Sequence, residues 1–110
     1  MEIQTRKESK TMIISVKGRI DAVTAPGLEK NLFHLIAQGE TALLLNLKEV
    51  DYISSAGLRI ILAAAKQLKA KSGELFIAGL QGSVRDVFQM SGFYSIFKIF
   101  ESEVEALKAL

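Results

Sequence analysis

Hydrophobic residues along this chain of 110 residues gather in short runs that predict five β-strands. Two of these runs, 3–7 and 11–17, flank a polar turn and indicate a hairpin. The run 42–47 is almost continuously aliphatic, which is typical of a strand that is covered on both faces of a sheet. Segments 74–78 and 94–100 predict two more strands, and the last of them is rich in aromatic residues.

Between the strands, apolar residues recur at the three- and four-residue spacing of amphipathic helices. The first helix is expected to take Thr24 as its N-cap and to hold Pro26 in its first turn. It should end at Gly39, because glycine adopts the backbone conformation that commonly closes a helix.

The helix that follows Ser54 and Ser55 has the clearest pattern in the chain. It should stop at the pair Ser72-Gly73, where the apolar spacing breaks off. The apolar residues that define its buried stripe are Leu58, Ile61, Leu62, Ala65 and Leu68.

Two shorter helices are predicted from capping boxes, in which a serine is followed three residues later by an acidic residue. Ser83 and Asp86 fit this pattern, and Gly92 should end the helix that they open. Ser102 and Glu105 fit it again and predict a helix at the C-terminus.

The resulting order of elements is strand, strand, helix, and then strand and helix three times more. Alternation of this kind is typical of parallel sheets joined by right-handed helical crossovers. We therefore expect one α/β domain over residues 1–110, with a mixed, mostly parallel β-sheet, an N-terminal β-hairpin and about four α-helices.

The composition is that of an ordinary globular protein, since 49% of the residues are hydrophobic, 24% are charged and the net charge is only +2. The chain has no cysteine, which excludes disulfides and thiolate chemistry. No apolar run approaches the roughly 20 residues of a membrane span, and the N-terminus lacks a signal core. We expect a cytoplasmic protein with no membrane span and no nucleic-acid partner.

Catalytic and metal-binding chemistry find little support in the sequence. Serine catalysis needs a nearby base, but the single histidine, His34, lies in the middle of the first predicted helix. The chain has no phosphate-binding glycine loop, and Asp21, Glu49 and Asp51 lack the spacing of a cation-binding loop. A phosphoryl receiver domain would need a second acidic residue beside Asp21. We therefore expect no enzymatic activity, cofactor or metal.

Ser54 and Ser55 stand where a strand gives way to the second helix, and this position suits an anion. The first N–H groups of a helix have no partners within the helix, and the helix dipole places partial positive charge there. From these residues alone, two interpretations stay open: a serine that caps the helix, and a serine that accepts a regulatory phosphate.

The segment 51–59, in which hydroxyl side chains precede the pair Gly57-Leu58, resembles the signature of the STAS domain, in particular that of anti-sigma factor antagonists. The segment 18–21 resembles the Gly-x-x-Asp loop of this family, 45–47 its third strand and 88–93 the end of its late helix. The resemblance covers nearly the whole chain.

In this family, the serine two positions before the Gly-Leu pair is phosphorylated by an anti-sigma factor that is also a kinase. The resemblance therefore implies Ser55 as the phosphorylation site, with Ser54 as the alternative. It implies that the unmodified protein binds the kinase and releases a sigma factor, and that a protein phosphatase reverses the modification. The partner-binding residues that it implies are Asp21, Ser54, Ser55, Ala56, Gly57 and Arg59.

The alternative function is a STAS interaction module of a transport or signalling assembly that is never phosphorylated. Ser54 is compatible with it, because better-known members of the family carry aspartate at this position.

Overall fold

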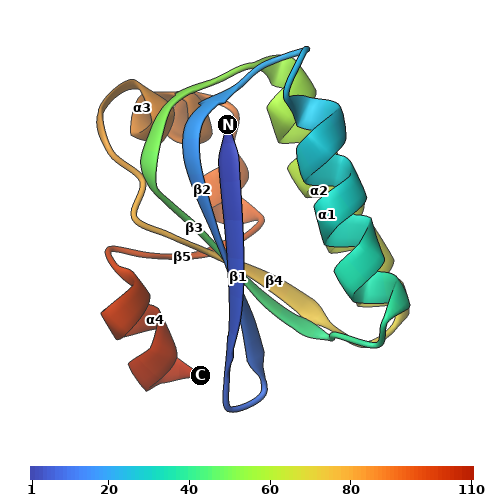
Figure 1. The fold of residues 1–110 in the computed structure, drawn as a ribbon. Helices are drawn as coiled ribbons and strands as arrows, with labels where there is room; N and C mark the ends of the chain where they lie inside the picture. The colour runs from blue at the N-terminus through green and yellow to red at the C-terminus, as the bar shows by residue number, and fades with distance from the viewer.

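Five strands form one mixed sheet, in the order β1-β2-β3-β4-β5, in a computed structural model that describes residues 1–110. The elements are β1 (Glu2–Glu8), β2 (Thr11–Ile20), α1 (Ala25–Ala37), β3 (Ala42–Ile53), α2 (Ser55–Ala70), β4 (Glu74–Ala78), α3 (Gly82–Met90), the 3-10 helix η1 (Phe93–Ser95), β5 (Lys98–Phe100) and α4 (Glu103–Ala109). Figure 1 shows this arrangement. The predicted order of strands and helices and the predicted fold class are confirmed.

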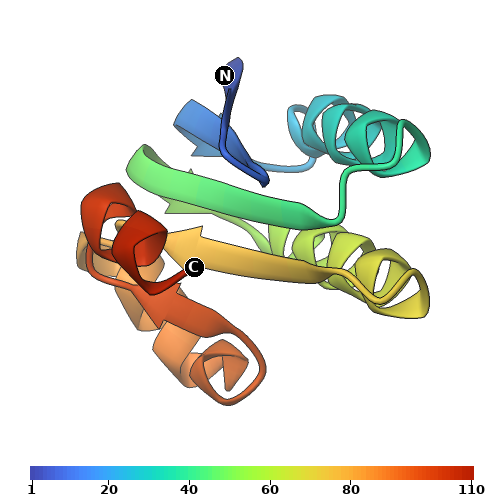
Figure 2. The same cartoon turned by 90° about the horizontal axis from the view of Figure 1, so that it is seen from below.

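The β1-β2 pair is an antiparallel hairpin, and all other neighbouring strands are parallel. The parallel strands β2 to β5 therefore have the same order across the sheet as along the sequence. Each connection between these strands is a right-handed crossover that moves one strand further in the same direction, so the connecting helices lie on the same face of the sheet. The helices α1, α2 and α3 all pack against this face. The helices α1 and α2 lie side by side, and α4 packs on the opposite side of the sheet (Figures 1 and 2).

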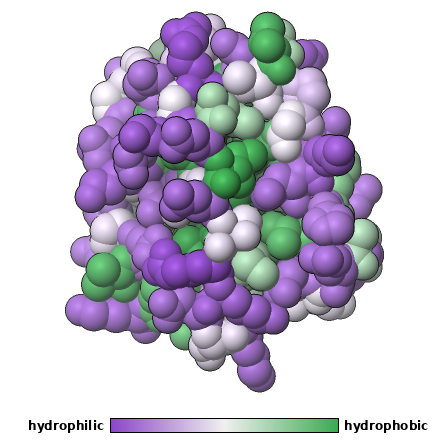
Figure 3. Space-filling view, in the orientation of Figure 1, coloured by the Kyte–Doolittle hydropathy of each residue, from purple (hydrophilic) through white to green (hydrophobic).

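The alternation of side chains along β3 divides the interior into two clusters. Leu43 and Leu45 point into the main core beneath α1, α2 and α3, whereas Leu44 points to the other face and contacts the cluster that includes Ala106 of α4. The side of the molecule seen in Figure 3 is mostly hydrophilic and carries only small, separate hydrophobic areas. None of the helices has the length and hydropathy needed to cross a bilayer.

Glu103, in the first turn of α4, fastens this helix to the sheet. Its carboxylate accepts hydrogen bonds from Asn46 Nδ2 at 3.0 Å and from the guanidinium of Arg6. The hydrogen bond from Arg6 is the main cause that lowers the pKa of Glu103, against the opposing effect of burial. The predicted cap of this helix is also present, since the Ser102 hydroxyl accepts from the backbone N–H of Glu105 at 3.2 Å.

Thr24 is the N-cap residue of α1, as predicted, but its side chain makes no capping hydrogen bond. In the loop before the helix, Asp21 Oδ1 accepts from the backbone N–H groups of Val23 and Thr24, both at 3.0 Å. The Thr24 hydroxyl accepts from the Asp21 N–H at 2.9 Å and donates to the Arg19 carbonyl at 2.8 Å. Side chains therefore close the loop that leads directly into α1.

Two predictions near the C-terminus are also corrected. The helix α3 begins one residue before Ser83, after Gln81, and no side chain caps it. The segment 94–100 is not one strand, because residues 93–95 form η1 and only Lys98–Phe100 pair with β4. Phe93 and Phe97 are both buried, four positions apart as on a helical turn, with ring centroids 5.4 Å from each other.

Candidate functional site

The loop that contains Asp21 and the start of α2 meet where β2 and β3 end. Ile20 and Ile53 are partners in the parallel ladder, and the Ser54 N–H donates to the Ile20 carbonyl at 2.9 Å. The carboxyl ends of parallel strands lie at one edge of a sheet, which is the usual place for binding sites in α/β folds. The structure therefore places Asp21 at the same edge of the sheet as the Ser54–Arg59 segment, as the sequence predicts. Figure 1 shows the end of β2 and the start of α2 at this edge.

Gly57 allows the first turn of α2 to rest directly on the ends of these strands. A Cβ atom at this position would lie 2.6 Å from Cγ2 of Ile20 and 2.9 Å from Cγ1 of Ile53, and both distances are too short for real contacts. Gly57 is buried, so it holds the serines in place and presents no side chain of its own.

The two serines have different environments. Ser54 is the N-cap of α2: its backbone is extended, and its hydroxyl accepts from the Gly57 N–H at 3.4 Å. Ser54 is half-buried, whereas Ser55 is the first residue of the helix and is exposed. The cap therefore uses one hydroxyl and leaves the other on the surface.

Asp21 is a charged member of this site. The backbone hydrogen bond from Thr24 is the main cause that lowers its pKa, and the hydrogen bond from Val23 and the charge of Arg19 act in the same direction against burial. Arg19 Nε lies 3.6 Å from Asp21 Oδ2. The carboxylate is therefore ionised at neutral pH, and its position is fixed by the loop that it closes.

Arg19 and Tyr52 belong to this edge of the sheet, although the sequence analysis did not identify them. They are partners in the β2-β3 ladder, and the Arg19 guanidinium lies 4.2 Å from the centre of the Tyr52 ring. Val23, in the adjacent loop, is 86% exposed. Exposed arginine and tyrosine side chains are enriched in protein-binding surfaces. The available signal was the position of Arg19 and Tyr52 near the ends of neighbouring strands.

An open groove of about 370 Å³ runs between the first turns of α1 and α2. Its walls include Pro26 and Glu29 from α1 and Ala56 and Arg59 from α2. The other three arginines of the chain each pair with a carboxylate, but Arg59 has none within 4.0 Å. Arg59 therefore offers a free guanidinium one helical turn from Ser55.

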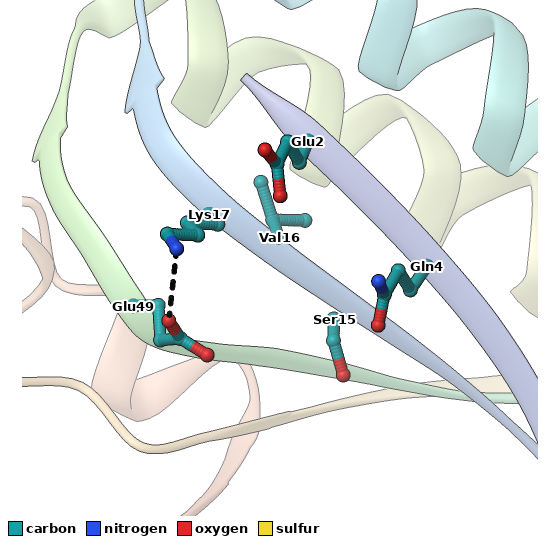
Figure 4. Close-up of a pocket in the computed structure, with 6 residues that line it drawn as sticks. All are labelled: Glu2, Gln4, Ser15, Val16, Lys17 and Glu49. Carbon is teal, nitrogen blue, oxygen red and sulfur yellow. Dashed lines mark ion pairs between the residues drawn. The ribbon is translucent and has the colours of Figure 1, made fainter.

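A second, smaller hollow of about 150 Å³ is lined by residues of β1, β2 and β3. Figure 4 shows its polar lining, in which Lys17 of β2 and Glu49 of β3 point toward each other. Their charged atoms are 3.9 Å apart, so the two charges neutralise one another. Val16 is the only hydrophobic residue of its lining, whereas the groove beside Ala56 and Arg59 has five. The structure also contains no group of three His, Cys, Asp or Glu residues that could hold a metal ion.

The fold and this sheet edge are those of a STAS domain. The model of the STAS domain family matches residues 2–106, and the chain belongs to that family. It is 39% identical over 109 residues to a protein of Bordetella bronchiseptica with the provisional name anti-sigma factor antagonist BtrV, covering 99% of this chain and 94% of the relative. It is 29% identical over 106 residues to the anti-sigma-B factor antagonist of Staphylococcus aureus, covering 96% and 98%.

Solved structures show the same fold. The crystal structure of an anti-sigma factor antagonist from Mycobacterium paratuberculosis has a TM-score of 0.91 at 27% identity, and the match covers 98% of this chain and 92% of that one. The unphosphorylated form of the anti-sigma factor antagonist SpoIIAA has a TM-score of 0.77 at 21% identity, covering 98% and 96%. The chain therefore has the STAS fold of the anti-sigma factor antagonists.

Proposed function

We propose that this protein binds an anti-sigma factor that is also a serine kinase, and thereby releases a sigma factor. The docking surface is the sheet edge that Asp21 shares with the start of α2. The residues that α2 and its N-cap contribute to this surface are Ser54, Ser55, Ala56, Gly57 and Arg59. Gly57 contributes by setting the position of the turn, and Arg59 contributes an unpaired positive charge. Relatives that are named anti-sigma factor antagonists match almost the full chain, which supports this proposal.

The phosphate acceptor in this proposal is Ser55. The observation that carries it is the division of roles between the serines: Ser54 is half-buried and caps the helix, whereas Ser55 is exposed and its hydroxyl is not used by the cap. A kinase needs a hydroxyl that it can reach. The Bacillus protein SpoIIAA, which shares this fold with a TM-score of 0.78, has been solved in a phosphorylated form.

Phosphorylation of Ser55 acts on the partner and leaves the fold in place. A phosphate adds about 1.5 to 2 negative charges, and the free N–H groups and dipole at the start of a helix stabilise it there. In the complex, the same charge sits beside the ionised Asp21, and it must be desolvated against the kinase. A difference of about 3 to 4 kcal/mol between the two forms lowers the affinity by two to three powers of ten. A separate protein phosphatase then restores the binding form.

Mass spectrometry after incubation with ATP and a purified anti-sigma factor kinase of the same organism tests this proposal. We expect a single phosphate on the wild type and on Ser54→Ala, and none on Ser55→Ala. A phosphate that survives in Ser55→Ala and disappears in Ser54→Ala would show that the acceptor is Ser54. If an active kinase phosphorylates none of the three proteins, the switch is refuted and the chain is a STAS module that is not modified.

A further inference from the structure

The main core fully buries only part of the apolar stripe of α2. Ile61 and Leu68 are fully buried, but Leu62 and Ala65, from the same predicted stripe, stay half-buried. These two residues line an open groove of about 480 Å³ between the second half of α2 and the chain that follows η1. We call it the α2–η1 groove.

The opposite wall of the α2–η1 groove contains an isoleucine that points away from the core. Ile96 is 57% exposed, whereas its neighbour Phe97 is 8% exposed and packs on Phe93. Leu75 of β4 adds a buried apolar residue to the lining. A large aliphatic side chain that is more than half exposed beside an apolar groove is typical of an interaction surface.

The charge around the groove is positive. Lys66 and Lys69 project from α2 along its rim, and neither has a carboxylate within 4.0 Å. The one acidic residue of the lining, Glu74, is neutralised by Lys98 at 3.7 Å. Lys69 complements the C-terminal end of the helix dipole, but Lys66 lies a turn earlier, where this effect has fallen off.

We propose that the α2–η1 groove binds an acidic amphipathic helix of a protein partner. The apolar face of that helix lies against Leu62 and Ile96, and its carboxylates lie beside Lys66 and Lys69. An open groove with an apolar floor suits a helix, whereas the sites of small apolar ligands enclose most of the ligand surface. Lys66 is roughly 16 Å from Ser55 along the helix axis, at 1.5 Å for each residue. A partner in this groove is therefore bound independently of the modification at Ser55.

The probe for this proposal is a synthetic amphipathic peptide with leucine at positions i, i+3, i+4 and i+7 and glutamate elsewhere. It is titrated into the ¹⁵N-labelled full-length protein, and a twin peptide with lysine in place of glutamate serves as the control. We expect changes in the amide chemical shifts of residues around Leu62 and Ile96 with the acidic peptide. The basic twin should cause no such changes.

Variants of the protein separate the charge from the apolar contact. The double variant Lys66→Glu/Lys69→Glu should weaken binding about tenfold, because attraction at the rim becomes repulsion. Ile96→Asp should abolish binding, and its spectrum reports whether the fold is intact. The double variant Lys30→Glu/Lys108→Glu, at exposed lysines of α1 and α4, is the matched control for charge and should bind as the wild type does. Ser55→Asp should also bind normally, which separates this test from that of the proposed function.

Several outcomes overturn the proposal. Equal binding of the two peptides, scattered shifts, or an unchanged affinity in the double lysine variant would each exclude an acidic helix. Shifts at the groove that change with dilution of the protein alone would assign it to a second copy of the chain. Shifts caused by a fatty-acid micelle but not by the peptide would assign it to an amphiphile.

Discussion

Replacement of Gly57 by alanine tests how the start of α2 is held against the strands. The new Cβ would meet Cγ2 of Ile20 at 2.6 Å and Cγ1 of Ile53 at 2.9 Å, so the helix or these buried side chains must move. Overpacking of this kind costs about 1 to 3 kcal/mol. Alanine also gains up to about 1 kcal/mol over glycine as a helix former. We therefore expect Gly57→Ala to lower the free energy of unfolding by about 1 to 2 kcal/mol.

Gly27 provides a matched control, because it is the third residue of α1 as Gly57 is the third residue of α2. A Cβ at Gly27 would meet only the end of the Met1 side chain at 3.6 Å, which is an ordinary contact. Gly27→Ala should therefore stabilise the protein by about 0.5 to 1 kcal/mol.

The two variants are compared by urea unfolding, followed by circular dichroism and fitted with one slope for all proteins. In thermal unfolding, the loss expected for Gly57→Ala corresponds to roughly 4 °C for each kcal/mol. Equal stability changes in the two alanine variants, or a Gly57→Ala protein that is at least as stable as the wild type, would refute the close approach of α2 to Ile20 and Ile53.

Three further variants test other parts of the site and the fold. Because the pKa of Asp21 is lowered in the folded state, its carboxylate stabilises the fold above the usual aspartate pKa near 3.9, and this stabilisation is lost as the pH falls below that value. Asp21→Asn should therefore lower the free energy of unfolding at pH 7 and make it decline less steeply between about pH 5 and pH 2, as measured by urea unfolding. Glu103→Ala should cost about 1 to 2 kcal/mol and speed amide exchange in α4, because Arg6 and Asn46 lose their acceptor. Arg59→Ala should leave the melting temperature unchanged and weaken binding of the anti-sigma factor by up to about tenfold, measured by calorimetry.

The sequence predicts a structural element best when a single physical effect decides its conformation. The strand Glu74–Ala78 has the predicted bounds, because a continuous apolar run in the middle of a parallel sheet has few other stable arrangements. The wrong predictions concern competition between neighbours. Thr24 suits the start of a helix, but the path of the chain after β2 turns its hydroxyl back toward the Asp21 N–H and the Arg19 carbonyl, so it does not reach the N–H groups of the first turn of α1.

The aromatic segment after α3 shows the same limit. Its residues suit a strand by composition, but the chain forms η1, and Phe93 packs edge-on against Phe88 in the main core with ring centroids 5.5 Å apart. The position of Asp21 and of the Ser54–Arg59 segment at one edge of the sheet was predictable, but the contact between Arg19 and Tyr52 was not. The division of roles between Ser54 and Ser55 was not, because it depends on which hydroxyl meets the Gly57 N–H.

The affinity of the anti-sigma factor kinase for the unmodified protein and for the protein phosphorylated at Ser55 tests the central claim most directly. Both forms are titrated into the purified kinase by isothermal calorimetry at one ionic strength. The unmodified form should bind, and the phosphorylated form should bind about a hundred to a thousand times more weakly, as expected for a difference of about 3 to 4 kcal/mol. Equal affinity of the two forms would contradict the proposal that Ser55 is the switch.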